Sequence, residues 1–308
     1  MVARIRYLVL ALVVVAILVS GIAYAYPWSL VSKYYTMQPT NPSISSSNTQ
    51  GYLIQLPQCY ISSNPYGGYT GTYGLLNCVA INYGAISVVV WFYEPSGGQG
   101  AILAYMNAQY PNVGVRTINL YITSNGVLYA GDAYGYTPWQ ITTSISPGWH
   151  IVVFEEWASS TSGPYYLAVY LDGNLLGTLS TTNLPRMFGG VSNWPYNNIG
   201  LSYGDGIWPY APNQWWFFNG AIALVALYNR VLTTGDVLAI YQGNLVTSGL
   251  VAVWYGDDYN PSNGHWVSRI GGYTGVPTTS SYPPRGCVLW NSTWYSGPTD
   301  IWSNWQQC

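Results

Sequence analysis

Strand-length runs joined by tight turns dominate the middle of this sequence and leave little room for other regular structure. Residues Tyr165–Leu171 are rich in aromatic and β-branched side chains, which favour strands. The triplet Asp172-Gly173-Asn174 then supplies a tight turn into Leu175–Thr178. Two such segments joined by a short turn predict an antiparallel β-hairpin.

A second hairpin and two longer strands are expected nearby. Residues Ile118–Ile122 alternate apolar and polar side chains, and the chain turns at Ser124-Asn125-Gly126 before Val127–Tyr129. The apolar runs Ile86–Tyr93 and Ile151–Phe154 have the composition of buried strands. Strands that recur at this spacing indicate two stacked sheets, so the predicted fold class is all-β, an antiparallel jelly-roll β-sandwich.

One short helix is expected after these strands, over Thr234–Tyr241. Thr233 and Asp236 have the spacing of a weak capping box, and Gly243 follows the end of the helical segment. Apart from a hydrophobic leader at the N-terminus, no other part of the sequence predicts a helix convincingly.

Four phrases occur in an order that is typical of a known family. They are Trp149-His150-Ile151-Val152-Val153, Leu171-Asp172-Gly173-Asn174, Phe218-Asn219-Gly220-Ala221-Ile222 and Leu227-Tyr228-Asn229-Arg230-Val231-Leu232. Together they resemble the laminin-G-like, concanavalin-A-like jelly-roll family over residues 85–244. The resemblance implies an exported recognition module. Because members of that family often bind calcium through loop acids, it also implies Asp132 and Asp205 as candidate calcium ligands.

The sequence divides into four parts around this region. Residues 1–33 form a leader or anchor, residues 34–84 an N-terminal extension, residues 85–247 the sandwich and residues 248–308 a C-terminal segment. The phrase Ser248–Tyr255 looks like the one that normally opens such a domain, although it follows the domain here. Two interpretations stay open: the phrase returns as a strand that completes the sandwich, or it opens a truncated second copy.

The N-terminus predicts export. Arg4 and Arg6 precede an uncharged apolar run, and Ala23-Tyr24-Ala25 offers a small-residue cleavage site, as in a secretory signal peptide. No further charge occurs before Lys33, so residues 7–25 also suit a retained membrane anchor. In both versions the remaining chain is displayed outside, in the extracellular space or on a virion surface.

Cysteine usage agrees with export. An even number of cysteines in an exported chain favours disulfides over metal ligands. Cys59 with Cys78 and Cys287 with Cys308 are the favoured pairs among three connectivities, because each closes a loop of roughly 20 residues. Asn291 begins the sequence's N-glycosylation triplet, which lies between the last two cysteines.

Charged residues are scarce, and this limits the kinds of partner that the protein can bind. The chain has 8 Lys and Arg and 10 Asp and Glu, against 31 Tyr and 15 Trp. Nucleic acids are not expected as partners, because binding them needs clustered cations. So few titrating groups also predict that stability depends only weakly on pH, which suits an acidic exterior. This composition resembles that of surface and virion proteins of thermoacidophilic archaea and their viruses.

A catalytic site is not expected. A glycosidase needs two carboxyl groups about 5 to 9.5 Å apart, whereas Glu155 and Glu156 are neighbours on a predicted strand and point to opposite faces. His150 lies in a strand phrase and His265 in a loop rich in Pro, Asn and Gly, and neither has a recognisable nucleophile partner. The sequence therefore predicts a protein that is not an enzyme, with calcium as the one cofactor suggested.

Aromatic and amide side chains cluster in two predicted loops. Exposed rings stack on the apolar faces of sugars, while amides hold the hydroxyls. The candidate ligand-binding residues are Trp194, Tyr196, Asn197, Trp208, Tyr210, Asn213 and Trp215. Packing of these rings over the sandwich edge, or against further copies of the chain in an envelope, virion or sheath, is the competing interpretation. The predicted partners are a glycan or surface protein, copies of itself, and a membrane through residues 7–25 if the leader is retained.

Overall fold

The computed structural model describes most of the chain between residues 54 and 277. The described ranges are 35–37, 54–94, 96–108, 112–218, 220–255, 259–260, 265–277, 286–290, 293–296 and 306–307. The leader, Cys308 and Asn291 lie outside these ranges, as does the side chain of Cys287, so the predictions made for them stay predictions. Within the described ranges, no helix has both the length and the apolar character that crossing a bilayer requires.

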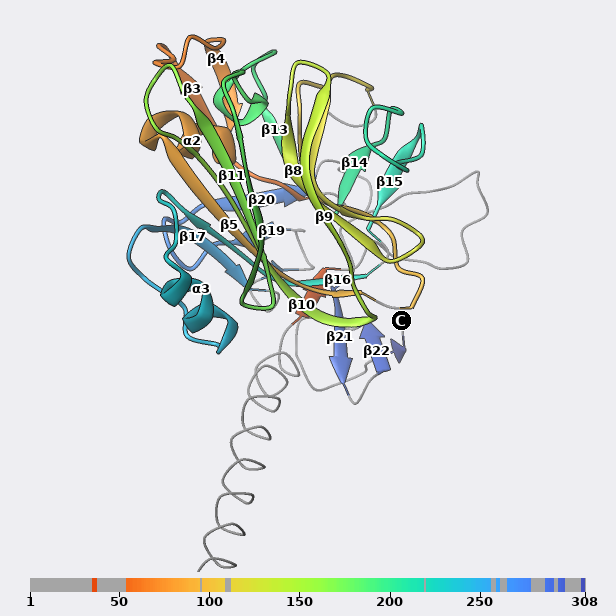
Figure 1. The fold of residues 1–308 in the computed structure, drawn as a ribbon. Coiled ribbons are helices and arrows are strands. Elements are labelled where there is room, and N and C mark those ends of the chain that lie inside the picture. Colours follow the sequence, from red (N-terminus) through yellow and green to blue (C-terminus); the bar gives the residue numbers. More distant parts are fainter. Residues whose placement is uncertain are drawn as a thin grey trace, which may run out of the picture.

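Two β-sheets stack face to face (Figure 1). Sheet A has the order β12-β11-β10-β5-β16-β1-β21-β22-β23, and β17 also pairs with β16. Its strands are β12 (Asn174–Thr181), β11 (Tyr165–Leu171), β10 (Gly148–Ala158), β5 (Ala85–Glu94), β16 (Ala221–Tyr228), β17 (Leu250–Tyr255), β1 (Tyr35–Met37), β21 (Gly286–Trp290), β22 (Thr293–Ser296) and β23 (Gln306–Gln307).

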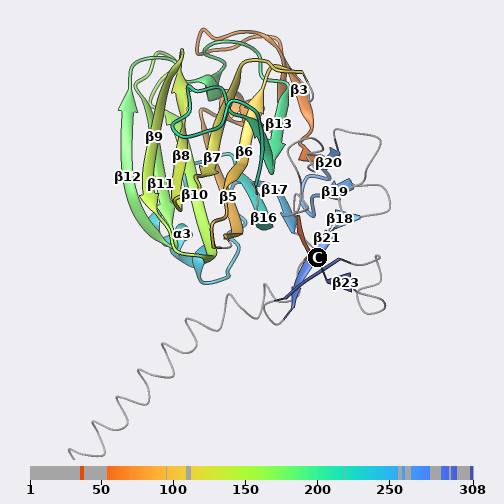
Figure 2. The ribbon, with the colours of Figure 1, turned by 90° about the vertical axis from the view of Figure 1, so that its right-hand side faces the viewer.

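Sheet B has the order β18-β19-β20-β2-β13-β6-β7-β8-β9 and lies in front of sheet A in the view of Figure 2. Its strands are β18 (Tyr259–Asn260), β19 (His265–Val267), β20 (Thr274–Pro277), β2 (Ile54–Gln55), β13 (Tyr196–Ile199), β6 (Gly100–Met106), β7 (Arg116–Ile122), β8 (Val127–Tyr134) and β9 (Thr137–Ser144). Two short strands, β14 (Leu201–Tyr203) and β15 (Trp215–Phe217), join it at β6. A separate hairpin pairs β3 (Gln58–Ile61) with β4 (Gly71–Gly74).

The predicted fold class is confirmed: the chain is an antiparallel jelly-roll β-sandwich. Both predicted hairpins form, since β11 pairs with β12 and β7 pairs with β8. The long apolar strands β5 and β10 lie side by side in the middle of sheet A, where Val152 faces Val90 and Phe154 faces Val88. Alternate side chains of these strands point between the sheets and form the main core.

The phrase after the domain returns to it. Strand β17 pairs antiparallel with β16, and Trp254 lies opposite Val225. This is the pairing that the hypothesis of a returning strand requires. The side chains of Ala252 and Trp254 enter the main core, whereas Val253 packs on the opposite face of sheet A.

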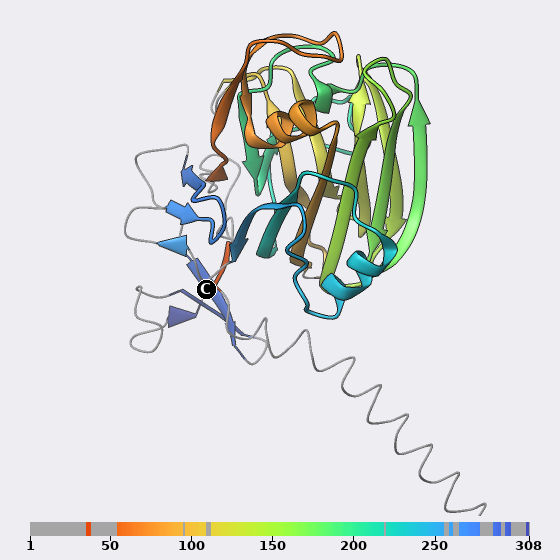
Figure 3. The ribbon, with the colours of Figure 1, turned by 90° about the vertical axis from the view of Figure 1, so that its left-hand side faces the viewer.

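The predicted helix α3 (Thr234–Tyr241) is present, with its capping box intact. The Thr233 hydroxyl accepts a hydrogen bond from the Asp236 N–H at 3.1 Å, and Asp236 accepts one from the Thr233 N–H at 2.8 Å. Figure 3 shows α3 against the outer side of sheet A, where Val237 and Ile240 are buried. This helix covers the outward-facing residues of β5, β10 and β16.

A second helix, α2 (Leu75–Tyr83), differs from the sequence prediction of a single short helix. It lies in the stretch assigned to an N-terminal extension, yet most of its residues are buried in the main core. Its N-cap is Gly74, which offers no side chain, and the Leu76 N–H instead donates to Asn197 Oδ1 of β13 at 2.7 Å. The predicted Cys59–Cys78 disulfide is confirmed and ties α2 to β3.

Candidate functional site

A flap covers part of the outer face of sheet B. We define the flap as residues 201–217, that is β14, the loop 204–214 and β15. Figure 1 shows β14 and β15 on the side of sheet B away from sheet A. Trp208 and Trp216 of the flap are buried there against outward-facing residues of β6, β7 and β8, which are Ala101, Ala104, Ile118, Tyr121 and Ala133. The flap is therefore anchored by apolar packing. Strand β9 and the rest of β8 lie next to it in the same sheet.

Three tyrosine rings lie next to one another in space at the edge of the flap. Tyr121 of β7 and Tyr129 of β8 are opposite each other in the strand pair, and their rings stack at 4.8 Å with an interplanar angle of 6°. Tyr210 of the flap loop lies 6.4 Å from the Tyr129 ring, centroid to centroid. Tyr121 is buried and Tyr129 partly exposed, whereas Tyr210 is 76% exposed. The buried ring thus backs the next one and holds it in place. We call Tyr121, Tyr129 and Tyr210 the tyrosine row.

Tyr210 has an unusual backbone. Its φ is +60°, a conformation that bulky residues rarely adopt. The surrounding turn holds it there, because the Ala211 N–H donates to the Trp208 carbonyl at 3.1 Å and Trp208 is buried under the loop. Such strained, exposed residues concentrate at ligand sites, where strain positions a side chain.

Uncharged polar groups surround the row. The Tyr121 hydroxyl lies 3.3 Å from Gln140 Oε1 and 3.3 Å from the Pro209 carbonyl oxygen, and its single O–H is shared between these two acceptors. Burial raises the pKa of Tyr121, so the hydroxyl stays neutral. On the other side of Tyr129, the exposed Thr142 of β9 occupies the opposing position. An aromatic face with amide, hydroxyl and carbonyl groups beside it suits a sugar.

An ion pair fixes the other end of the flap. Arg116 Nη2 lies 3.0 Å from Asp205 Oδ2, and Arg116 Nη1 donates to the Gly114 carbonyl. The Tyr203 ring covers the guanidinium, with 4.5 Å from Cζ to the ring centroid. Tyr203 in turn meets Trp215 edge to face at 5.4 Å. The arginine is therefore occupied on several sides and is only 7% exposed.

The structure separates the predicted ligand-binding residues into two groups. Tyr210 and Asn213 are exposed on the flap loop, and Tyr196 and Trp215 are partly exposed. Trp194, Asn197 and Trp208 are buried and cannot stack on a ligand while the sandwich is closed.

The buried three have structural partners instead. Trp194 packs edge to face on Tyr105 in the main core at 5.1 Å, and Trp208 packs under the flap. Asn197 Oδ1 accepts from the Leu76 N–H, and Asn197 Nδ2 donates to Asn77 Oδ1 at 2.9 Å, which is how β13 caps helix α2. A substitution of Trp208 should therefore disturb the packing of the flap directly and affect a ligand only through that change.

Both candidate calcium ligands are bound to protein groups. Asp132 is fully buried, accepts from the Tyr105 hydroxyl and accepts from the Met187 N–H at 2.8 Å. Asp205 is paired with Arg116 and also accepts from the Ile207 N–H at 3.1 Å. Over the described ranges, no three His, Cys, Asp or Glu side chains come together as a metal site.

We therefore expect calcium to leave the protein's thermal stability unchanged. A carboxylate that already holds an arginine or several hydrogen bonds loses those partners if it binds a cation. Melting curves recorded with millimolar calcium and with a chelator should superimpose. A shift of several degrees on adding calcium would contradict this expectation.

Two acids do meet in the structure, although not the neighbours considered from sequence. Glu155 and Glu156 point to opposite faces of sheet A as predicted: Glu155 accepts from the Leu232 N–H at 2.8 Å on the α3 side, whereas Glu156 points into the core. There it faces Asp132 of sheet B. Both carboxyl groups are 0% exposed, so a substrate cannot reach them in the closed sandwich.

The Trp149-His150 phrase also has a structural role. His150 Nδ1 lies 2.8 Å from Asp172 Oδ2, and its Nε2 lies 2.7 Å from the Ser146 carbonyl oxygen. Asp172 Oδ1 further accepts from the Ile151 N–H at 2.9 Å. These bonds tie the turn between β11 and β12 to β10. Both ring nitrogens of His150 are occupied.

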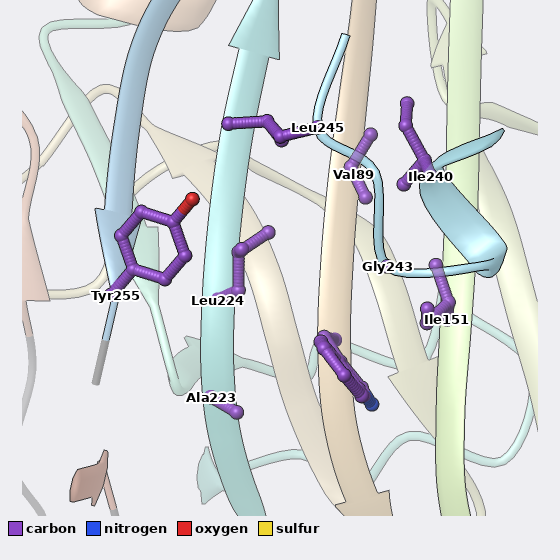
Figure 4. Close-up of a pocket in the computed structure, with 9 residues that line it drawn as sticks. Val89, Ile151, Ala223, Leu224, Ile240, Gly243, Leu245 and Tyr255 are labelled. Carbon is purple, nitrogen blue, oxygen red and sulfur yellow. The ribbon is translucent and has the colours of Figure 1, made fainter. Parts of the chain in front are cut away.

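A pocket lies on the opposite side of the molecule, on the outer face of sheet A (Figure 4). It has a volume of about 90 Å³ and lies between strands β5, β10, β16 and β17 and the end of α3. Apart from the Trp91 ring nitrogen and the Tyr255 hydroxyl, the side chains that line it are apolar: Val89, Trp91, Ile151, Ala223, Leu224, Ile240, Gly243, Leu245 and Tyr255. Because it offers so few polar groups to orient a sugar, the outer face of sheet B is the better candidate site.

Comparisons with known proteins give distant likenesses among solved structures alone. No known protein-family model matches the sequence, and no curated protein matches it. Among solved structures, a proposed carbohydrate-binding protein from Bacteroides ovatus is 12% identical with a TM-score of 0.46, over 80% of this chain and 58% of that one. The CBM40 domain of the Ruminococcus gnavus IT-sialidase is 17% identical with a TM-score of 0.39, over 61% and 97% of the two chains.

A SAP-like pentraxin from Limulus polyphemus is 15% identical with a TM-score of 0.39, over 70% of this chain and 85% of that one. At TM-scores below 0.5 these likenesses say nothing about what this chain binds. The protein is an antiparallel jelly-roll β-sandwich with a row of tyrosines on the outer face of one sheet.

Proposed function

We propose that this protein is a non-catalytic, externally displayed β-sandwich that binds glycans on the outer face of sheet B. The observation that carries the proposal is the tyrosine row, in which a buried ring backs a partly exposed ring beside an exposed one. Rings held in place lose little conformational freedom when a ligand binds, so more of the contact energy remains as affinity. Gln140, Thr142 and the Pro209 carbonyl supply hydrogen-bonding groups next to them.

Display outside the cell is supported by separate features. Disulfides persist in oxidising surroundings, and the Cys59–Cys78 bond fastens α2 to the rest of the domain. The leader with Arg4 and Arg6 and the scarcity of charge are typical of an exported chain. Surface recognition or adhesion on a cell envelope or virion is the role that such a module would serve.

The test is a glycan array probed with the wild-type protein and with Tyr129→Ala. Removing the stacking ring should lower the affinity for the bound glycans by about tenfold, since aromatic contacts of this kind contribute on the order of 1 kcal/mol. Tyr129→Phe keeps the ring and should bind like the wild type. Tyr60→Ala is a matched control, because Tyr60 is 72% exposed on β3 and lies outside the site.

The outcomes separate the proposal from its alternative. Equal glycan binding by Tyr129→Ala and the wild type would place the site elsewhere. The alternative, a structural component that assembles through its aromatic loops, is favoured by the exposure of Tyr210 and the partial exposure of Trp215. It predicts no glycan binding and an oligomer, measured by analytical ultracentrifugation, that dissociates in Tyr210→Ala.

A further inference from the structure

We infer that the face formed by the tyrosine row takes uncharged glycans and rejects sialylated or sulfated ones. This inference rests on the proposed function and names the ligand class of the same site. It comes from the arginines of the described residues, each of which is already engaged, and from the hydrogen-bonding character of the groups that surround the row.

Arg116 pairs with the flap on the same side of sheet B, at the other end of the flap from the tyrosine row. Its Nη2 pairs with Asp205, its Nη1 donates to the Gly114 carbonyl, and the Tyr203 ring covers its guanidinium. A glycan carboxylate or sulfate would have to displace Asp205 to reach it. Because Asp205 carries the same charge and is held by the same chain, the ligand gains no net attraction from this arginine.

The remaining arginines of the described ranges are either buried or engaged away from the tyrosine row, although Arg269 is exposed. Arg186 is 0% exposed, and its Nε donates to the Gly135 carbonyl at 2.7 Å. Arg230 pairs with Asp236 at 2.9 Å beside helix α3, on the side of sheet A. Arg269 lies over the Tyr255 ring, with 4.4 Å from Cζ to the centroid. Over the described part of the chain, none of these side chains offers a free positive charge to a ligand on the tyrosine row.

The groups that do surround the row favour hydroxyls over anions. The Pro209 carbonyl and Gln140 Oε1 are acceptors, which bind the O–H of a sugar and repel a carboxylate. The faces of tyrosine rings carry negative charge density, which attracts the C–H groups of a sugar face and repels anions. An anionic substituent would lose its hydration here without gaining a charged partner, and that loss is unfavourable.

The experiment uses matched pairs of glycans that share a neutral core. Lactose and 3′-sialyllactose form one pair, and sulfated and unsulfated forms of the neutral glycans that bind on the array form the others. We expect the charged member of each pair to bind at least about tenfold more weakly. We also expect the affinity for the neutral member to stay constant from about 50 mM to about 0.5 M NaCl, because no charge attraction is screened.

The results distinguish the inference from the proposed function. Tighter or equal binding of the charged members, with Tyr129→Ala still reducing it, would overturn the inference and leave the glycan site standing. Absence of binding by every glycan would overturn both. Asp205→Asn releases Arg116 and should bring the affinities for the neutral and the charged glycan of each pair closer together. The control Asp236→Asn releases Arg230 on the side of sheet A and should leave the ratio of these affinities unchanged. An unchanged ratio in Asp205→Asn would overturn the role assigned to the Arg116–Asp205 pair.

Discussion

We expect the protein to lose thermal stability as the pH rises from about 4 to about 9. Burial raises the pKa of all three glutamates: Glu94, Glu155 to about 7, and Glu156 well above its ordinary value, the last also because of the Asp132 charge. A carboxyl whose pKa is raised by folding stabilises the fold below its unfolded pKa, and this stability is lost as the pH rises through the folded pKa. For Glu155 alone the loss between about pH 4.5 and 7 is on the order of 3 kcal/mol.

Other titrating groups modify this dependence. Burial lowers the pKa of His150, but the hydrogen bonds to Asp172 and Ser146 outweigh burial and leave it raised, so its contribution also fades as the pH rises. Asp236 acts in the opposite sense. The Arg230 hydrogen bond lowers its pKa to about 2, so it stabilises the fold above its unfolded pKa of 3.8 and loses that effect only in strong acid.

Calorimetry across this pH range measures the effect directly. Glu155→Gln and Glu156→Gln should each flatten the decline and raise the melting temperature near pH 8, by roughly 2 to 4 °C for each kcal/mol. Asp236→Asn is the control, because it should lower the melting temperature near neutral pH without flattening the decline. A melting temperature that rises with pH in the wild type, or glutamine variants that follow the wild type in parallel, would contradict the account.

Opening the Cys59–Cys78 disulfide should cost about 3 kcal/mol of unfolding free energy. The bond closes a loop with a sequence separation of 19, and a loop of this length loses about that much freedom in the unfolded chain. It also holds β3 against α2, whose Leu76 and Ala80 are fully buried in the main core. Its loss therefore releases a core element as well as a loop.

Urea unfolding of Cys59→Ser combined with Cys78→Ala measures this loss, with alanine chosen at the buried position. The variant isolates this bond, whereas reducing the wild type would also open the predicted Cys287–Cys308 bond and should therefore cost at least as much. A loss below about 1 kcal/mol would mean that α2 is held by Asn197 and apolar packing without help from the disulfide.

The sequence composition predicted that stability depends only weakly on pH. The buried glutamates lead instead to the expectation of a marked dependence. The composition gives the number of acidic residues, but it does not show which of them are buried and so have a raised pKa. Strand alternation places Glu156 on the inner face of β10, yet only the stacking of the two sheets brings it to Asp132, 24 positions earlier in the chain. The stability that we expect in acid therefore depends on the packing of the two sheets.

Local patterns predicted the strands well because each signal is contained within a few residues. The turn at Asp172-Gly173-Asn174, the apolar run of β5 and the capping box of α3 all act over short distances. Helix α2 lacks such a signal. It begins after Gly74 without a side-chain cap, and its capping group comes from Asn197 on a strand more than a hundred residues later.

In the candidate site, too, some features could be predicted from the local sequence and others depend on tertiary packing. The loop that carries Tyr210, Asn213 and Trp215 could be predicted from composition, but the burial of Trp208 depends on the flap folding onto β6, β7 and β8. Tyr121 and Tyr129 were missed, although the predicted hairpin places them on paired strands at opposing positions. Drawing the register of that hairpin would have revealed the pair of rings.

A crystal structure of the protein with the neutral oligosaccharide that binds best on the array tests the central claim most directly. The account predicts that a sugar ring packs on Tyr129, with Tyr210 at its edge and its hydroxyls bound by Gln140 and the Pro209 carbonyl. A sugar bound in the apolar pocket of sheet A, or at any surface that leaves Tyr129 free, would contradict it.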